Sequence, residues 1–109
     1  PEGIVIPWIT TLGFLRVATS RRIFARPLPV DDVLERLESW LALPHVRTLH
    51  PADKHFERLK GALSRLGTAG NLTTDAHLAT LAIERGCVLY TTDSDFARFE
   101  NLKWVNPCI

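Results

Sequence analysis

The sequence predicts an α/β domain in which a mostly parallel central sheet is flanked by helices. Two observations carry this prediction. Short apolar segments typical of strands alternate along the chain with segments that repeat apolar residues at helical spacing. The 109 residues also contain 46% hydrophobic amino acids, which is enough for the core of one small domain. We therefore expect a single domain over residues 1–109.

The first half of the chain is expected to hold two strands and two helices. In order, these elements are a strand over residues 3–8, a helix over 9–19, a basic loop over 20–28, a helix over 30–43 and a strand over 46–49. The second helix has the clearest apolar stripe. Asp32 and Glu35 have the spacing of a capping box, which predicts that they lie at its start.

The second half of the chain is expected to hold two longer helices, a buried strand and an edge strand. The elements are a helix over residues 52–66, a loop over 68–73, a helix over 75–86, a strand over 87–92, a short turn over 96–99 and a strand over 102–105. Gly67 and Gly86 are typical residues for the C-terminal ends of the two helices.

Three aspartates are the candidate functional residues, because chain geometry predicts that they converge. The helix that begins at Asp75 and the strand that follows it have similar lengths, roughly 16 and 20 Å. If the strand folds back along the helix, Asp93 and Asp95 at its far end return beside Asp75. Clustered carboxylates repel one another unless a hard cation neutralises them. We therefore predict a divalent-metal site formed by Asp75, Asp93 and Asp95.

Asp75 also has a simpler interpretation as an acidic residue in the first turn of a helix, with Thr73 or Thr74 as the cap. However, Asp75, Leu78 and Ala82 follow one line along the predicted helix, so the carboxylate should face the sheet together with the apolar side chains. A half-buried carboxylate needs a cation or hydrogen-bond donors. This favours the metal site.

Asp93 and Asp95 could likewise form a solvated turn after a strand. The carboxyl ends of parallel strands are nevertheless where sites form in open α/β sheets. An aspartyl-phosphate enzyme is disfavoured, because the residue two positions beyond Asp95 is Ala97 and not a hydroxylated or β-branched residue. His77 faces another side of the helix from Asp75, so we do not expect it to be a ligand.

The charge distribution points to a local phosphate contact. The net charge is only +1, which does not predict binding to bulk nucleic acid. Four arginines nevertheless fall within a segment that carries no acidic residue: Arg16, Arg21, Arg22 and Arg26. They form either a solvated surface or a group that positions phosphate beside the metal site.

Cys87 and Cys108 follow no signal peptide, so we expect reduced thiols in the cytoplasm and no disulfide. No apolar run approaches the ~18 residues that a membrane-spanning helix requires, so no membrane association is expected.

Several segments together resemble the PIN-domain ribonuclease toxins of the VapC family. They are Gly70–Ala79, Tyr90–Phe99, Leu102–Trp104, Phe14–Thr19 and Arg22–Phe24. The resemblance implies a PIN-like fold and a toxin of a type II toxin–antitoxin system that hydrolyses RNA with Mg²⁺ or Mn²⁺. It also implies a cognate antitoxin and a homodimer as partners.

The resemblance assigns roles residue by residue. The third and fourth acidic residues of the family correspond to Asp75 and Asp93, which would be the catalytic metal ligands, with Asp95 as an assisting neighbour. Apart from the resemblance, the arginine segment supplies the residues that we expect to contact RNA, which are Arg16, Arg21 and Arg22. The second acidic residue of the family, usually a glutamate, corresponds to Gly13, which supplies no ligand.

The family's first aspartate lies on an opening central strand that has no counterpart in this sequence. We therefore expect a PIN-like domain that is incomplete at its N-terminus, with the gap filled by the protein's own missing N-terminal segment. Activity of residues 1–109 alone would then be doubtful. Because Gly13 weakens the acidic set, the alternative function is a non-catalytic PIN-like module that binds RNA or protein.

Overall fold

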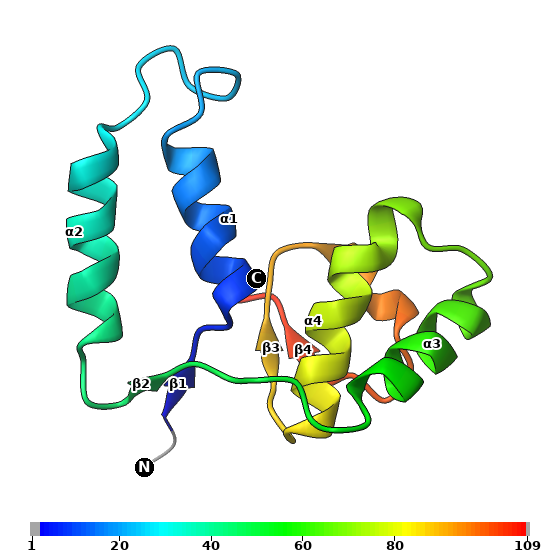
Figure 1. Ribbon diagram of the computed structural model, residues 1–109. Helices are drawn as coiled ribbons and strands as arrows, with labels where there is room; N and C mark the ends of the chain where they lie inside the picture. The colour runs from blue at the N-terminus through cyan, green and yellow to red at the C-terminus, as the bar shows by residue number, and fades with distance from the viewer. Residues whose placement is uncertain (1–2, 109) are drawn as a thin grey trace. The chain divides into compact units, whose positions relative to one another are not determined.

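The computed structural model describes residues 3–108, which divide into two compact units (Figure 1). Unit 1 extends to His50 and unit 2 begins at Pro51. Each unit has its own hydrophobic core and its own short parallel sheet. The single domain expected over residues 1–109 stays a prediction.

Unit 1 pairs a short parallel sheet with a helical hairpin. Its elements are β1 (Ile4–Val5), α1 (Trp8–Ala18), α2 (Val30–Leu41) and β2 (Val46–Arg47). β1 and β2 are parallel, with Ile4 opposite Val46. α1 packs on α2, and the core between them contains Ala18, Val33 and Leu37.

Both helices of unit 1 begin directly after a proline. Pro7 precedes α1 and Pro29 precedes α2, and the proline ring holds φ near the value that a helix start requires. The Pro29 carbonyl accepts hydrogen bonds from the amides of Asp32 and Val33, so α2 already starts at Val30. Asp32 therefore lies inside the first turn, and the predicted capping box of Asp32 and Glu35 is wrong.

Unit 2 contains the remaining elements in an alternating order. They are α3 (His55–Leu66), the 3-10 turn η1 (Gly70–Leu72), α4 (Thr73–Glu84), β3 (Leu89–Tyr90), the 3-10 turn η2 (Ser94–Arg98) and β4 (Trp104–Val105). β3 and β4 are parallel, with Leu89 opposite Trp104. Gly67 ends α3 with a φ of 74°, in the left-handed region that glycine adopts most easily.

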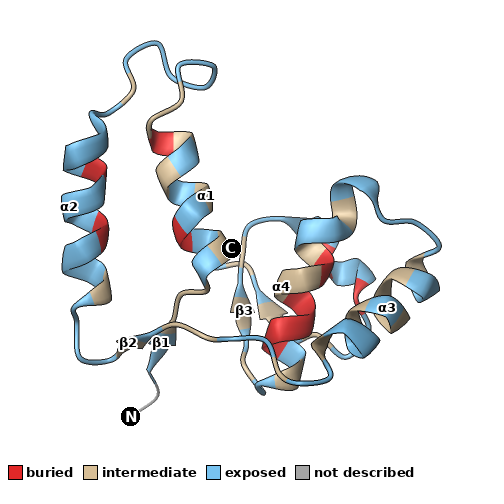
Figure 2. Cartoon of the chain, in the orientation of Figure 1, coloured by how far each residue is buried: buried red, intermediate tan, exposed pale blue. Residues whose placement is uncertain are grey.

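α4 is the most deeply buried helix of unit 2, as the red segments in Figure 2 show. Small side chains at Ala76 and Ala79 allow close packing against Phe96 and Phe99, and these four residues form the buried core. Leu59 and Leu63 of α3 pack against the same cluster. The phenylalanines thus anchor η2 and the residue that follows it beside α4.

The predicted α/β class is confirmed, and both strand pairs are parallel as expected. Each strand is only two residues long, shorter than the segments predicted over 3–8, 46–49, 87–92 and 102–105. In the described part of the chain, β1 pairs with β2 and β3 pairs with β4 in separate sheets. Among residues 3–108, no helix combines the length and apolar character needed to cross a bilayer.

Candidate functional site

Asp75 lies in the first turn of α4, as its third residue. The helix follows directly on η1, and the residue that precedes it, Leu72, makes no side-chain capping bond. Thr73 and Thr74 are therefore helical residues, and the expectation that one of them caps the helix is wrong. The Asp75 side chain is half-buried, consistent with its predicted orientation toward the apolar side of α4.

Asp93 and Asp95 are held by the 3-10 turn that follows β3. The Asp93 carboxylate accepts a hydrogen bond from the Asp95 amide through Oδ1, at 2.9 Å, and so caps η2. The Asp93 amide in turn donates to Oγ1 of Thr91 at 3.1 Å. These two bonds fix the Asp93 backbone and orient its carboxylate, although both aspartates are exposed.

The three aspartates are coupled electrostatically. Burial raises the pKa of Asp75 above its ordinary value, and the negative charges of Asp93 and then Asp95 raise the pKa further. Coupling of this kind requires the three carboxylates to share one region of unit 2. We call Asp75, Asp93 and Asp95 the acidic corner. The three aspartates thus lie in one region of unit 2, and their convergence on a shared metal ion stays a prediction.

The acidic corner has the donor chemistry of a divalent-metal site but not a closed cage. Within residues 3–108, no three His, Cys, Asp or Glu side chains lie close enough together to hold an ion between them. All three donors are carboxylate oxygens, which Mg²⁺ and Mn²⁺ prefer, and a cation would relieve their mutual repulsion. The chemistry of these donors suits such an ion, and its binding stays a prediction.

The arginines predicted to contact RNA belong to unit 1. Arg16 lies in the last turn of α1, and Arg21 and Arg22 lie in the loop that follows. All three side chains are exposed. The loop is turned by a hydrogen bond from the Arg22 amide to Oγ of Ser20, at 3.2 Å. Their contact with RNA stays a prediction.

Gly13 lies in the middle of α1, where the backbone does not require glycine. A Cβ atom added there would meet no other atom within 4 Å. Neither packing nor backbone conformation therefore explains the glycine, which costs a helix about 1 kcal/mol relative to alanine. A longer side chain could be accommodated at this position.

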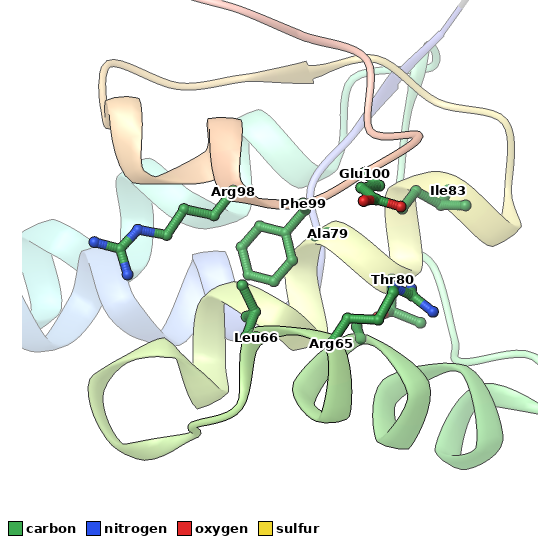
Figure 3. Close-up of a pocket in the computed structure, with 9 residues that line it drawn as sticks. Arg65, Leu66, Ala79, Thr80, Ile83, Arg98, Phe99 and Glu100 are labelled. Atoms are coloured by element: carbon green, nitrogen blue, oxygen red, sulfur yellow. The ribbon is translucent and has the colours of Figure 1, made fainter.

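The cavity shown in Figure 3 does not coincide with the acidic corner. It has a volume of about 80 Å³ and lies where α3, α4 and the end of η2 meet. Arg65 and Arg98 line it, but their guanidinium groups extend to opposite sides of the Phe99 ring. They do not converge on a common ligand, so this cavity has no arrangement of charges that would bind an anion.

A second polar cluster in unit 2 was not predicted from the sequence. His55 of α3 contacts Glu84 and His77 of α4, and Arg58 also contacts Glu84. Burial alone would raise the pKa of Glu84, but hydrogen bonds from His55, Ala52 and Arg58 lower it below its ordinary value. Burial lowers the pKa of His77, and the charge of His55 lowers it further.

No sequence signal pointed to this cluster. The residues that meet are 22 to 29 positions apart, a separation that matches no ligand spacing. The contact depends on which faces of α3 and α4 pack together, and apolar periodicity does not specify this for half-buried polar positions.

The family assignment follows from comparison with known proteins. The model of the PIN domain matches residues 2–102. The chain belongs to the PIN-domain family. Ribonuclease VapC33 of Mycobacterium tuberculosis is 45% identical over 105 residues, which are 96% of this chain and 72% of that protein. Ribonuclease VapC37 of the same species is 40% identical over 106 residues, covering 97% and 74%.

Solved structures confirm the expected PIN-like fold. The structure of VapBC-1 from nontypeable Haemophilus influenzae superposes with a TM-score of 0.69 at 20% identity, covering 95% of this chain and 74% of that one. The predicted resemblance to the VapC group of PIN-domain proteins is thus confirmed at the level of family and fold.

Proposed function

We propose that this PIN-domain chain is a VapC-type toxin that hydrolyses phosphodiester bonds in RNA with the help of Mg²⁺ or Mn²⁺. The observation that carries the proposal is the match of the PIN domain to residues 2–102, which include Asp75, Asp93 and Asp95. Relatives named ribonuclease VapC at 40–45% identity support the reaction class. The similarity to VapBC structures supports a cognate antitoxin as partner.

The three aspartates of the acidic corner have different roles in this proposal. Asp75 and Asp93 hold the cation, and Asp95 assists while its amide orients the Asp93 carboxylate. A bound divalent ion supplies the Lewis acidity and the activated water that phosphodiester hydrolysis requires. Half-burial of Asp75 excludes part of the solvent from this corner and so strengthens its interaction with a cation.

The arginines of unit 1 position the substrate. Arg16, Arg21 and Arg22 present exposed guanidinium groups, which bind phosphate oxygens in a geometry that a lysine does not reproduce. Such contacts orient the RNA without reading its sequence. We place this activity in the cytoplasm, where the free thiols of Cys87 and Cys108 remain reduced.

Unit 1 also offers surface for protein partners. Large apolar side chains are exposed along and after α1 and along α2; among them are Trp8 at 52%, Leu12 at 58% and Leu28 at 54%. Exposed large apolar side chains, where they form a patch, mark interaction sites. We assign this surface to the antitoxin and to a second copy of the chain.

The test is RNA cleavage with and without Mn²⁺. We expect the protein to cut single-stranded RNA only when Mn²⁺ is present, and Asp75→Asn to lower the rate at least ~100-fold, because a ligand and its transition-state stabilisation are lost. Asp31→Asn is the matched control, since Asp31 is an exposed acid in the first turn of α2. Equal rates for the two variants would contradict a catalytic role for Asp75.

The same experiment distinguishes the proposed ribonuclease from the alternative, a non-catalytic binding module. Gly13 supplies no carboxylate, an observation that favours a non-catalytic module that binds RNA or protein. Such a module would bind RNA without cutting it, and Asp75→Asn would leave its RNA affinity unchanged or raise it.

A further inference from the structure

A chain of hydrogen bonds connects both ends of α4 to the start of α3. Glu84, the last residue of α4, has a side chain with no solvent exposure. Its carboxylate accepts from Nδ1 of His55 at 2.5 Å, from Arg58 at 3.0 Å and from the Ala52 amide at 3.4 Å. A buried carboxylate with three donors is a rigid anchor, because breaking the set would leave an unpaired buried charge.

The chain continues from His55 to His77 near the start of α4. Nε2 of His55 lies 2.9 Å from Nδ1 of His77, and the two rings meet edge to face with centroids 4.9 Å apart. Because a carboxylate can only accept, Nδ1 of His55 carries the proton that faces Glu84. Nε2 of His55 and Nδ1 of His77 share the second hydrogen bond, in which one ring nitrogen donates and the other accepts.

His77 is well placed to control the orientation of Asp75. The two residues are separated by about 3 Å along the helix axis and about 200° around it. A bond from His77 to α3 therefore acts on the same turn as Asp75 but on the opposite face. No side chain caps the start of α4. The bond between His77 and His55 therefore restrains the first turn of the helix in place of a capping side chain.

The orientation of Asp75 requires such a constraint, because Asp93 and Asp95 repel its carboxylate. Repulsion could be relieved by a rotation of the first turn of α4 or by its fraying, either of which would turn the carboxylate toward solvent. Ala76 and Ala79 pack against Phe96 and Phe99 on the buried side of α4, but their methyl groups form no directional bond. The hydrogen bond of His77 resists it directly.

We propose that the His77–His55–Glu84 chain is a positioning device that sets the rotation of α4 and keeps Asp75 directed toward Asp93 and Asp95. The inference deepens the proposed function and rests on it for the role of the acidic corner in holding a cation. His77 and His55 are positioning residues, since they act on the cation only through Asp75.

The first experiment needs no metal. Amide hydrogen exchange is measured at residues 77–80, whose hydrogen bonds close the first turn of α4. His77→Leu removes the hydrogen-bonding ring of His77, and exchange should accelerate about tenfold. His77→Asn should restore slow exchange, because its amide places a hydrogen-bonding group, donor or acceptor, near the position of Nδ1. Adding Asp93→Asn to His77→Leu should also slow exchange, since it removes a repelling charge.

The rescue by Asp93→Asn is the result that a merely structural histidine would not produce. If His77→Leu does not fold, His77→Ala takes its place in both comparisons, because alanine is the best helix former. Unchanged exchange at residues 77–80 in the Leu or Ala variant would overturn the inference. Acceleration that Asp93→Asn fails to reverse would overturn it as well.

The second experiment measures the affinity for Mn²⁺ by calorimetry. His77→Leu should weaken binding about tenfold, as is common when a group that supports a metal ligand is removed. Leu63→Ala is the matched control: it loosens the packing of α3 on the core without touching the chain, so it should lower stability but keep the affinity. Equal weakening by both variants would contradict the proposed positioning.

The two experiments distinguish a failure of the proposed function from a failure of the positioning role. A wild-type protein that binds no Mn²⁺ would contradict the proposed function, while hydrogen exchange would still decide whether the chain positions α4. Normal Mn²⁺ binding by His77→Leu, together with unchanged exchange, would overturn the positioning role and leave the proposed function intact.

Discussion

Asp75 is the residue at which the proposed function and the stability of the protein conflict. Its carboxylate is half-buried, and the negative charges of Asp93 and Asp95 repel it. A bound cation would offset this repulsion, whereas in the metal-free protein the repulsion lowers stability. An acidic residue in the first helical turn also gains about 0.3–1 kcal/mol from the helix dipole. Burial is the largest cause of the raised pKa of Asp75, so we expect burial and repulsion to exceed this gain.

Asp75→Asn should therefore stabilise the metal-free protein near neutral pH. The folded state binds the Asp75 proton more tightly than the unfolded state, so wild-type stability falls as pH rises from 3.8 through the raised pKa. The asparagine variant lacks this loss. Its advantage should vanish at pH values well below 3.8, where the aspartate is protonated in both states.

Urea unfolding of both proteins in the presence of a chelator, as a function of pH, measures the difference. Asp53→Asn, at an exposed position of unit 2, is the control for replacing a carboxylate by an amide. A variant Asp75→Asn that is less stable than wild type at neutral pH would show that the interaction with the helix dipole prevails.

At the level of elements, η2 is the piece that couples the hydrophobic core to the acidic corner. Phe96 is only 4% exposed and packs against Ala76 and Ala79, while its neighbour Asp95 faces solvent. The position of the exposed carboxylates thus depends on a buried ring in the same short turn.

Phe96→Ala should lower the free energy of unfolding by about 3 kcal/mol and weaken Mn²⁺ binding, because the cavity left behind frees η2 to move. Phe56→Ala makes the same chemical change at a side chain that is 73% exposed, and should alter stability by no more than about 0.5 kcal/mol. Chemical denaturation and calorimetry test both variants. If Phe96→Ala destabilises the protein but keeps the full Mn²⁺ affinity, the packing of Phe96 does not position the acidic corner.

The sequence predicted those features that depend on local geometry. Apolar spacing located the helices, and matched helix and strand lengths placed Asp75 and Asp93 in the same region of unit 2. The loop predicted over residues 68–73 contains the 3-10 turn η1, which is too short to show any periodicity. The capping box of Asp32 and Glu35 was wrong because Pro29 precedes the first residue of α2, which places Asp32 inside the first turn. Contacts between separate helices, such as His55 with Glu84, follow from tertiary packing and leave no local signature.

At the level of the whole molecule, the residues proposed to contact RNA and those proposed to hold the cation belong to different units. Unit 1 carries the arginines and unit 2 carries the acidic corner. The net charge of +1 means that long-range attraction contributes little, so binding should depend on a few local contacts.

This dependence predicts how salt weakens binding. Each phosphate contact on single-stranded RNA contributes about 0.7 to the slope of log K against log salt concentration, because it releases condensed counterions. Arg21→Gln should therefore make the slope shallower by about 0.7 and weaken binding regardless of RNA sequence. The measurement uses fluorescence anisotropy with a short unstructured RNA and the Asp75→Asn protein, which keeps the RNA intact.

Lys60→Gln is the control, because Lys60 is an exposed cation on α3, outside the arginine segment. It should change neither the slope nor the affinity at moderate salt. If Lys60→Gln reduces the slope while Arg21→Gln does not, the RNA follows α3, and the arginines of unit 1 are a solvated surface. A reduction of about 0.7 for each of Arg16, Arg21 and Arg22, and none for Lys60, would instead assign one phosphate contact to each arginine.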